Sequence, residues 1–303
     1  MPKRVSRREF IKKAAIGGLA AYAAPALIKI GAAEETYPDL VLVEGDDPAQ
    51  IVRKAVEAIG GMGRFVKKGD VVAVKPNIAW NRRPEQAATT NPDVVAEVVR
   101  MCLEAGAKQV KVFDIPCESP RMTYRRSGIE KAAKKAGAKV IYPDERKIKE
   151  VAIPEGENIK SWPMFTEALE ADVLINVPIA KHHTAARLTM AIKNLMGILG
   201  GERGALHPNL HQNLADLATR IKPNLDILDA YRILIAHGPT GGSLQDVRLT
   251  KKVIVGTDIV AVDSLGSTLF GLKGEDIGYI RNAHRMGVGE ISLDKLKIRK
   301  IKI

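Results

Sequence analysis

Lysine and histidine side chains follow apolar stretches of this chain at points where strands of a sheet would end. Lys75 comes directly after the apolar residues 71–74, and Lys181 and His182 come shortly after residues 173–177. In an open α/β sheet, ligands bind beyond the carboxyl ends of the strands. A lysine can bind an anion, and a histidine exchanges protons near neutral pH. The spacing therefore predicts a cationic site that binds an anion and transfers a proton.

Lys193 and Asn194 interrupt a strongly apolar stretch, residues 188–199, which predicts a buried helix. An unpaired ammonium in a core is costly, so Lys193 must pair with a carboxylate, lose its proton or face a polar cavity. A structural salt bridge to Asp216 or Asp263 is one alternative. We favour the other, in which Lys193 faces the site and binds an anion or acts as an acid or base.

Two glycine-rich stretches, residues 197–204 and 238–242, would let backbone amides approach a ligand, although a helix end or a tight turn explains glycine equally well. The substrate-binding positions that we predict there are Gly200, Gly201, Gly238, Thr240 and Gly241. Neither stretch ends in the Gly-Lys-Ser/Thr of a Walker loop, and no dinucleotide fingerprint follows a strand. The sequence therefore contains no motif for ATP or NAD.

A pair of histidines, His207 and His211, stands four residues apart at a predicted helix start, close enough to share a metal ion. Asp229 and Asp258 each follow a predicted strand and would either add oxygen ligands or orient the lysines. These four residues are the metal ligands that we predict, for a divalent cation. Helix capping or polar contacts at the rim of the site explain the histidine pair equally well.

These residues need a framework, and the chain supplies short apolar stretches that alternate with amphipathic ones. The predicted strands are residues 40–43, 71–74, 110–113, 140–142, 173–177, 226–228, 233–235 and 253–255. The predicted helices are residues 48–59, 92–105, 129–136, 188–199, 210–221, 259–270 and 275–286. Strands this apolar are covered on both faces. The predicted fold class is therefore α/β, a three-layer, mostly parallel sheet with helices on both faces; residues 295–303 should form an edge strand, and residues 154–163 are the best candidate for an insertion.

The first 33 residues predict a twin-arginine export signal. Arg7 and Arg8 stand in the run Ser6-Arg7-Arg8-Glu9-Phe10-Ile11-Lys12, ahead of a weakly apolar stretch at residues 14–28. Small residues follow, so we expect cleavage after Ala33; an uncleaved anchor and a basic tip on an ordinary helix are the alternatives. The predicted organisation is a signal peptide at 1–33 and a single α/β domain at 34–303. The twin-arginine translocase would then be a partner, and the location would be extracytoplasmic.

Composition narrows the classes of ligand. Residues 1–33 contribute +6 of the formal net charge of +12, which leaves a mildly basic domain. Such a balance favours a small anionic partner, and with aromatic residues at 4% there are few platforms for stacking bases, so we expect no nucleic acid. The two cysteines, Cys102 and Cys117, are too few for a four-thiolate iron–sulfur cluster. No later stretch reaches the ~18 apolar residues of a membrane span, so membrane contact is expected only through the signal segment. The oligomeric state stays open.

The ordered series of landmarks resembles the family called domain of unknown function 362. The matching residues are Lys75-Pro76-Asn77, 171–178, Lys181-His182, 193–197, His207, Asp216, Asp229, 238–242, Asp258 and 261–263. The resemblance covers about residues 40–293. This family has no assigned activity, so the resemblance supports the site residues more than a reaction. Many relatives resemble iron–sulfur proteins through an appended cluster-binding module, and this chain, with two cysteines, departs from that pattern.

Two functions fit these observations. The first is an exported enzyme that acts on a small anionic substrate, with or without a metal ion; any redox chemistry would need a bound cofactor of unknown identity. The catalytic residues that we predict for it are Lys75, Asn77, Lys181, His182, Lys193 and Asn194. The second is a non-catalytic ligand-binding protein or an accessory subunit of an extracytoplasmic redox system. We favour the enzyme, because buried lysines and a histidine in one crevice are costly for docking alone.

Overall fold

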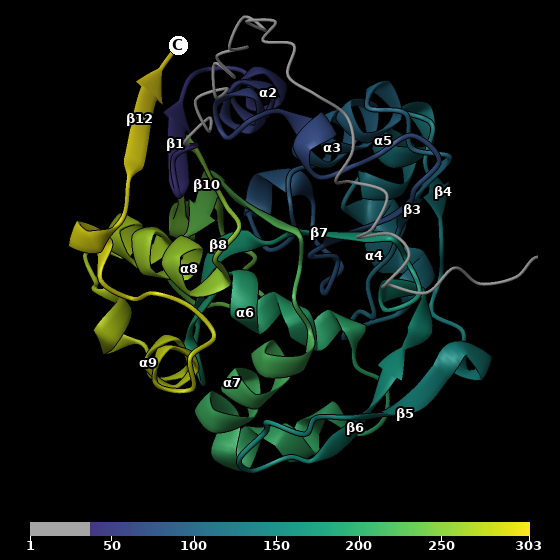
Figure 1. Cartoon of the computed structure of the whole chain (residues 1–303), viewed down its shortest axis with the longest axis vertical. Helices are drawn as coiled ribbons and strands as arrows, with labels where there is room; N and C mark the ends of the chain where they lie inside the picture. Colours follow the sequence, from purple (N-terminus) through teal and green to yellow (C-terminus); the bar gives the residue numbers. More distant parts are fainter. Residues whose placement is uncertain (1–36) are drawn as a thin grey trace, which may run out of the picture. The chain divides into compact units, whose positions relative to one another are not determined.

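The computed structural model describes residues 37–303, which form one compact unit. The predicted export signal at residues 1–33 lies outside the described residues. Within the described unit the predicted fold class is confirmed: a mostly parallel sheet lies between two layers of helices (Figure 1). Along this part of the chain, no helix is both long enough and apolar enough to cross a membrane.

The central sheet has the strand order β12-β1-β11-β10-β7-β2-β3-β4, and β8 and β9 extend it beside β10. Its strands are β1 (Leu40–Glu44), β2 (Val71–Pro76), β3 (Gln109–Val112), β4 (Lys139–Val140), β7 (Val173–Val177), β8 (Ile179–His183), β9 (Arg187–Thr189), β10 (Leu225–Leu234), β11 (Val247–Gly256) and β12 (Ile298–Lys302). The pairs β1–β11, β10–β11 and β8–β9 are antiparallel, and the other pairs are parallel. The carboxyl ends of β2, β3, β7 and β10 therefore share one edge.

Helices cover the two faces in two groups. One face carries α2 (Pro48–Ala58), α3 (Pro92–Glu104), α4 (Pro120–Arg126) and α5 (Ile129–Lys135), and the other carries α6 (Ala191–Asn194), α7 (Leu210–Arg220), α8 (Ile259–Ser267) and α9 (Gly278–Arg285). Alternate strand residues serve the two cores: Val72 and Val74 pack with the first group and Ala73 with the second. The helix starts follow the sequence, since Asp47 and Asn91 cap α2 and α3 just before a proline.

The predicted helix at residues 188–199 is confirmed only in part, because helical structure is confined to residues 191–198. Its first residues belong to β9, which pairs with β8, and Met190 has an extended backbone with φ −146° and ψ −144°. Only the four-residue α6 and a 3₁₀ turn, η5 (Leu195–Ile198), follow. An apolar run suits a strand and a helix alike, and the pairing with β8 decides between them here.

Two other predictions need correction or extension. The predicted strands at 226–228 and 233–235 are parts of the single strand β10, whose register with β11 shifts between Ala230 and Arg232. The predicted insertion at 154–163 falls largely between β5 (Ile148–Ala152) and β6 (Ser161–Phe165), which form a separate two-stranded sheet. The predicted edge strand at 295–303 is confirmed as β12.

Candidate functional site

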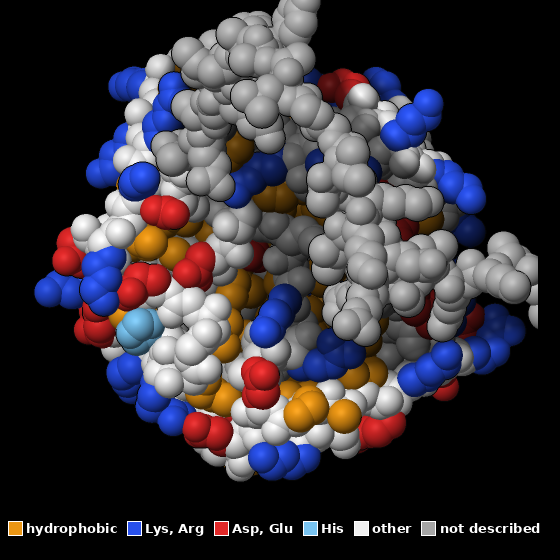
Figure 2. Space-filling view, viewed as in Figure 1, with side chains coloured by type: hydrophobic (Ala, Val, Ile, Leu, Met, Phe, Trp, Pro, Cys, Tyr) orange, Lys and Arg blue, Asp and Glu red, His pale blue; other side chains and the backbone are white. Residues whose placement is uncertain are grey.

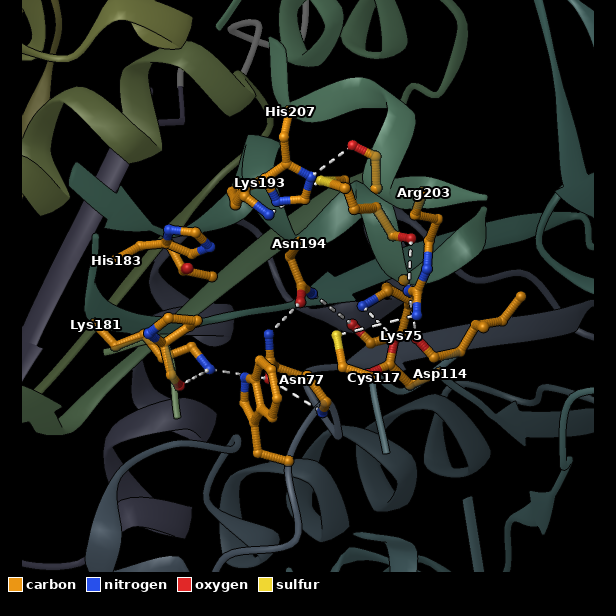
Figure 3. Close-up of a pocket in the computed structure, with 18 of the residues that line it drawn as sticks. Lys75, Asn77, Asp114, Cys117, Lys181, His183, Lys193, Asn194, Arg203 and His207 are labelled. Atoms are coloured by element: carbon orange, nitrogen blue, oxygen red, sulfur yellow. Dashed lines mark hydrogen bonds and ion pairs between the residues drawn. The ribbon is translucent and has the colours of Figure 1, made fainter. Parts of the chain in front are cut away.

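A cavity of about 450 Å³ lies at the edge of the sheet where β2 and β3 end. Its wall consists of the end of β2 and the residues after it, the segment after β3, the β8–β9 hairpin, the α6–η5 segment, residues 201–207 and Pro239. Figure 3 shows Lys181 and His183 on one side of this cavity and Lys75, Asp114 and Arg203 on the other. Segments distant in the sequence thus converge on one site.

The charges of the wall are unbalanced. Lys75, Lys181, Lys193 and Arg203 line the cavity, and Asp114 is the one carboxylate among its described lining residues. On the outer surface the signs are mixed, because lysine, arginine and acidic side chains alternate around the face seen in Figure 2. Within the cavity, positive charge is therefore in excess.

Lys75 is the one lysine of the cavity with an ionic partner among the described residues. Its Nζ lies 2.7 Å from Asp114 Oδ1 and donates to the Pro76 carbonyl at 2.8 Å. The other oxygen of Asp114 accepts the Ile78 N–H at 2.6 Å. Burial lowers the pKa of Lys75, and the Asp114 carboxylate opposes that shift. The pair is fixed from both sides, which makes Lys75 a rigid part of the wall.

Lys181 is equally buried, with 1% of its surface exposed, and the partners that it contacts are neutral. Its Nζ donates to the carbonyls of Ala88 at 2.6 Å and Pro239 at 3.1 Å, and it lies 3.5 Å from Asn77 Oδ1. Burial lowers the pKa of Lys181 to about 7, and repulsion from Lys193 contributes. The amine can therefore exist in both protonation states near neutral pH.

Lys193 has the least compensation. Its Nζ contacts the thioether of Met196 at 3.0 Å, and no carboxylate within residues 37–303 forms an ion pair with it. Burial lowers the pKa of Lys193 to about 8, with repulsion from Arg203 and Lys75 added. The salt-bridge alternative fails because Asp216 and Asp263 bind backbone N–H groups instead. Lys193 lines the cavity from α6, which is within the part of the predicted helix that the structure confirms.

Asn77 and Asn194 belong to a buried chain of amides. Asn77 Nδ2 donates to Asn194 Oδ1 at 3.0 Å, and Asn194 Nδ2 donates to Asn176 Oδ1 at 2.8 Å. Asn176 Nδ2 in turn donates to Asp226 Oδ1 at 2.7 Å. Asp226 Oδ1 is the acceptor at the end of this series of hydrogen bonds. Each of the three amides therefore donates toward Asp226. Asn77 is thereby left with its Oδ1 near the Lys181 ammonium.

Of the two adjacent histidines, the one that faces the cavity is not the predicted one. His183 lines the cavity, whereas His182 does not, and the Nδ1 of His182 accepts the Gly238 N–H at 3.1 Å. Neighbouring residues of a strand face opposite ways, so only one of the two can enter the cavity. The prediction that His182 faces the site is wrong, because it chose the residue on the opposite side of the strand.

The four predicted metal ligands do not come together. His207 lines the cavity, whereas the ring of His211 stacks on Tyr279 with centroids 6.2 Å apart. Asp229 accepts the backbone N–H groups of Asn91 and Tyr231. Across residues 37–303, no group of three or more His, Cys, Asp or Glu side chains is arranged to hold a metal ion.

Asp258 lies at the opposite edge of the sheet, because β11 runs antiparallel to β10. Its carboxylate caps α8 by accepting from Val260 N and Ala261 N, and it also accepts from Glu290 N. The expectation that every strand of the sheet ends at the same edge therefore fails for β11.

Most of the predicted glycine positions lie outside the cavity wall. Gly201 lines the cavity, whereas Gly200, Gly238, Thr240 and Gly241 do not. The glycine that matters for the site is Gly197, since a methyl group there would overlap the Asp114 carboxylate and approach the Lys75 ammonium at 2.5 Å.

Further residues of the wall are not among the predicted catalytic, substrate-binding or metal residues: Trp80, Asp114, Cys117, His183, Thr189 and Arg203. Arg203 donates to the carbonyls of Ile115 at 2.8 Å and Pro116 at 2.6 Å, which joins the segment after β3 to η6 (Arg203–Asn209). The signals that could have found them are the glycines around Arg203 and the position of Asp114 directly after a strand. Cys102 and Cys117 are both free.

The family of this chain is identified from the segment that forms the cavity. A family model described as "Domain of unknown function (DUF362)" matches residues 72–268, which include every residue of the cavity wall. The chain belongs to the DUF362 family. A curated relative, a thylakoid-associated protein of Synechocystis sp., is 29% identical over 245 residues, covering 78% of this chain and 74% of the relative.

Two solved structures are similar at lower levels. One is the lactate racemase apoprotein from Thermoanaerobacterium thermosaccharolyticum, with 14% identity, a TM-score of 0.45 and coverage of 72% of this chain. The other is a protein from Thermotoga maritima, with 12% identity, a TM-score of 0.40 and coverage of 75% of this chain. This DUF362 chain spans 54% and 60% of the lengths of those two chains, respectively.

Proposed function

We propose that the cavity is the active site of an enzyme that acts on a small anionic substrate. One observation carries the proposal: four cationic side chains line the cavity with a single carboxylate among its described lining residues. Burying charges without partners is costly, and an anionic ligand would offset that cost. Lowered lysine pKa values in a concave site are also typical of functional residues.

The lysines divide naturally into two roles. Lys193 and Arg203 would bind the anionic group, with Lys75 fixed behind them by Asp114. Lys181 would transfer the proton, because its pKa of about 7 lets the amine accept a proton and the ammonium return it. The amide of Asn77 would orient Lys181, from which its Oδ1 lies 3.5 Å.

Calorimetric titration with glutarate and with sulfate tests the binding step. Both ions remain doubly charged near neutral pH, so changes in affinity report on the protein. Wild-type protein should bind at least one of them, and Lys193→Met should weaken that binding roughly tenfold or more, about the effect of one lost charged contact. Lys222→Met removes an exposed lysine elsewhere and should leave the affinity unchanged. Failure of both ions to bind, or equal losses in both variants, would contradict an anion site.

Turnover needs a separate measurement. Wild-type protein and Lys181→Met are incubated with a mixture of small carboxylic acids and phosphate esters, and the mixture is followed by mass spectrometry. The enzyme hypothesis predicts consumption of an acid by wild-type protein alone. Retained anion binding with no consumption by either protein would instead favour the non-catalytic, ligand-binding alternative.

We further propose that the protein is exported by the twin-arginine route. The support is the Ser6-Arg7-Arg8 run ahead of the weakly apolar residues 14–28. Replacing both Arg7 and Arg8 by lysine should retain the protein in the cytoplasm during cell fractionation. Unchanged extracytoplasmic recovery of that variant would exclude this route.

A further inference from the structure

One wall of the cavity is a β-hairpin that presents three polar side chains on the same face. Lys181 and His183 are two residues apart on β8, and Thr189 of β9 lies directly opposite Lys181 in the register. All three line the cavity. Residues at this spacing point to the same side of a hairpin. The hairpin wall, defined as Lys181, His183 and Thr189, is therefore one continuous surface facing any ligand.

The backbone fixes the tautomer of His183. Its Nδ1 accepts two N–H groups, from Ala185 at 3.1 Å and from Ala186 at 3.1 Å. A ring nitrogen that accepts carries no proton, so the proton of the neutral imidazole is on Nε2. Nε2 is thus a hydrogen-bond donor, and it cannot serve as a base.

The surroundings of His183 also keep it neutral. The ionisable groups that act on it are Lys193, Lys181, His207 and His182, and each of them disfavours a second positive charge. Burial and these neighbours lower the pKa of His183 to about 3. The imidazole is therefore neutral throughout the range in which Lys181 titrates, a division of labour between a neutral donor and a titrating amine.

Thr189 supplies an independent sign of a ligand. Its side chain is 4% exposed, and its Oγ1 has no hydrogen-bond partner among the described residues. Buried hydroxyl groups are nearly always hydrogen-bonded, since leaving one unpaired lowers the stability of the fold. In a residue that lines a cavity, the missing partner is most simply an atom of the bound molecule.

We infer that His183 Nε2–H and Thr189 Oγ1–H form a neutral donor pair that binds a carbonyl oxygen of the substrate. This inference rests on the proposed function, because the anionic group of the same molecule would bind Lys193 and Arg203, which line the same cavity. Two uncharged donors suit an uncharged acceptor oxygen, whereas the cations suit a carboxylate. The structure thus points to an oxo acid, an anion with a separate carbonyl group, as the class of substrate.

Nitrogen NMR of the histidine rings tests the donor directly and needs no ligand. The account predicts that His183 shows a protonated Nε2 and an unprotonated Nδ1 from about pH 8 to about pH 5, below the ordinary histidine pKa of about 6.5. A proton on Nδ1, or a titration near the ordinary value, would overturn the inference. The His183→Asn spectrum identifies the signal by its loss.

A charge-matched pair of ligands tests the substrate class. 2-Oxoglutarate and glutarate differ by one carbonyl group, and wild-type protein should prefer the oxo acid by roughly fivefold to tenfold, the value of one or two hydrogen bonds. Equal binding of the two would overturn the carbonyl assignment while leaving the anion site intact. Failure of both to bind would contradict the proposed function itself.

Three variants assign the preference to the hairpin wall. Thr189→Val removes the hydroxyl at nearly constant shape, and His183→Asn keeps an acceptor near the Ala185 and Ala186 N–H groups but cannot reach the cavity as Nε2 does. Both should reduce the preference for the oxo acid severalfold with little change in glutarate affinity. His183→Gln, which retains a distant N–H donor, should recover part of it. Loss of affinity for both acids in parallel would indicate a structural role only and would overturn the inference.

Discussion

Two neighbouring regions of the molecule bury charged side chains, and they differ in how those charges are compensated. At the start of α6, the Asp263 carboxylate accepts the N–H groups of Ala191 at 2.6 Å and Ile192 at 3.0 Å. In the cavity, at the next residue of the chain, the partly buried Lys193 has the thioether of Met196 as its one hydrogen-bond partner among residues 37–303. Burial raises the pKa of Asp263 to about 7, the two backbone donors oppose that shift, and the carboxyl group holds the start of α6 in place. Lys193 lacks a partner of opposite charge among the described residues, and we attribute that to a ligand.

The same contrast separates a second pair of charges. The Asp216 carboxylate accepts three backbone N–H groups, from Glu157, Asn158 and Ile159, at 2.7–2.9 Å. Lys181, although equally buried, donates only to neutral oxygens. Burial of a charge alone therefore does not identify a functional residue. The groups that contact the charge identify it.

The largest loss of stability from a substitution is expected at Asp263. Asp263→Ala should lower the free energy of unfolding by about 3 kcal/mol, because two buried N–H groups lose their acceptor. Asp263→Asn keeps one acceptor oxygen and should cost less. Urea denaturation measures the stability of both variants. A loss below about 1 kcal/mol for the alanine variant would contradict the structural role of Asp263.

The next effect concerns the close approach that holds Lys75 and Asp114 together. Gly197→Ala should destabilise the protein by about 2 kcal/mol, since the added methyl group overlaps the Asp114 carboxylate and must displace it. Gly204→Ala is the matched control: a methyl group there meets nothing within 4 Å, so the stability should change little. Similar melting curves for the two variants would contradict the tight packing around this ion pair.

A smaller effect of opposite sign, a gain in stability, is expected at Lys193. Lys193→Met removes a partly buried charge that has no carboxylate partner among residues 37–303 and keeps the apolar stem, so the protein should become more stable by about 1 kcal/mol. Anion affinity should fall at the same time. A clear loss of stability would show that Lys193 is structural after all.

The last expected effect is a dependence of stability on pH, and its size is set by how far the pKa of Lys181 is lowered. The pKa of Lys181 is about 7 in the fold and 10.5 ordinarily, so between these values the unfolded chain binds more protons than the folded chain. The Lys181 contribution therefore makes stability rise as pH increases from about 7 to about 10, which is the direction for a lowered lysine pKa. Lys181→Met should flatten that rise in urea midpoints taken across this range. An unchanged slope would mean that the pKa of Lys181 is not lowered.

The layers of the fold and the three lysines of the site can be predicted from the sequence alone. Lys75, Lys181 and Lys193 can be found because each interrupts or follows an apolar stretch, where burying a charge costs stability unless it binds something. His183 cannot be distinguished from His182, since alternation along a strand gives two faces but not the one that meets the cavity. That choice depends on how β8 pairs with β10 and β9.

The remaining errors come from strand pairing, which is not local. Asp258 joins the predicted site only if its strand runs parallel to the others, and the pairing of β11 with β10 reverses it. Residues 188–199 look like one helix because an apolar run has the same composition in β9 as in α6. Arg203 gives little signal, because its contacts with the carbonyls of Ile115 and Pro116 join distant segments of the chain.

The most direct test of the central claim is the proton balance of anion binding. Glutarate is titrated into wild-type protein at about pH 8 in two buffers of different ionisation enthalpy, and the difference in heat gives the protons exchanged. Lys181 and Lys193 have pKa values of about 7 and about 8, and a bound anion must raise both, so binding should take up protons from the buffer. Binding with no proton uptake, or with proton release, would contradict the account that uncompensated lysines hold the ligand.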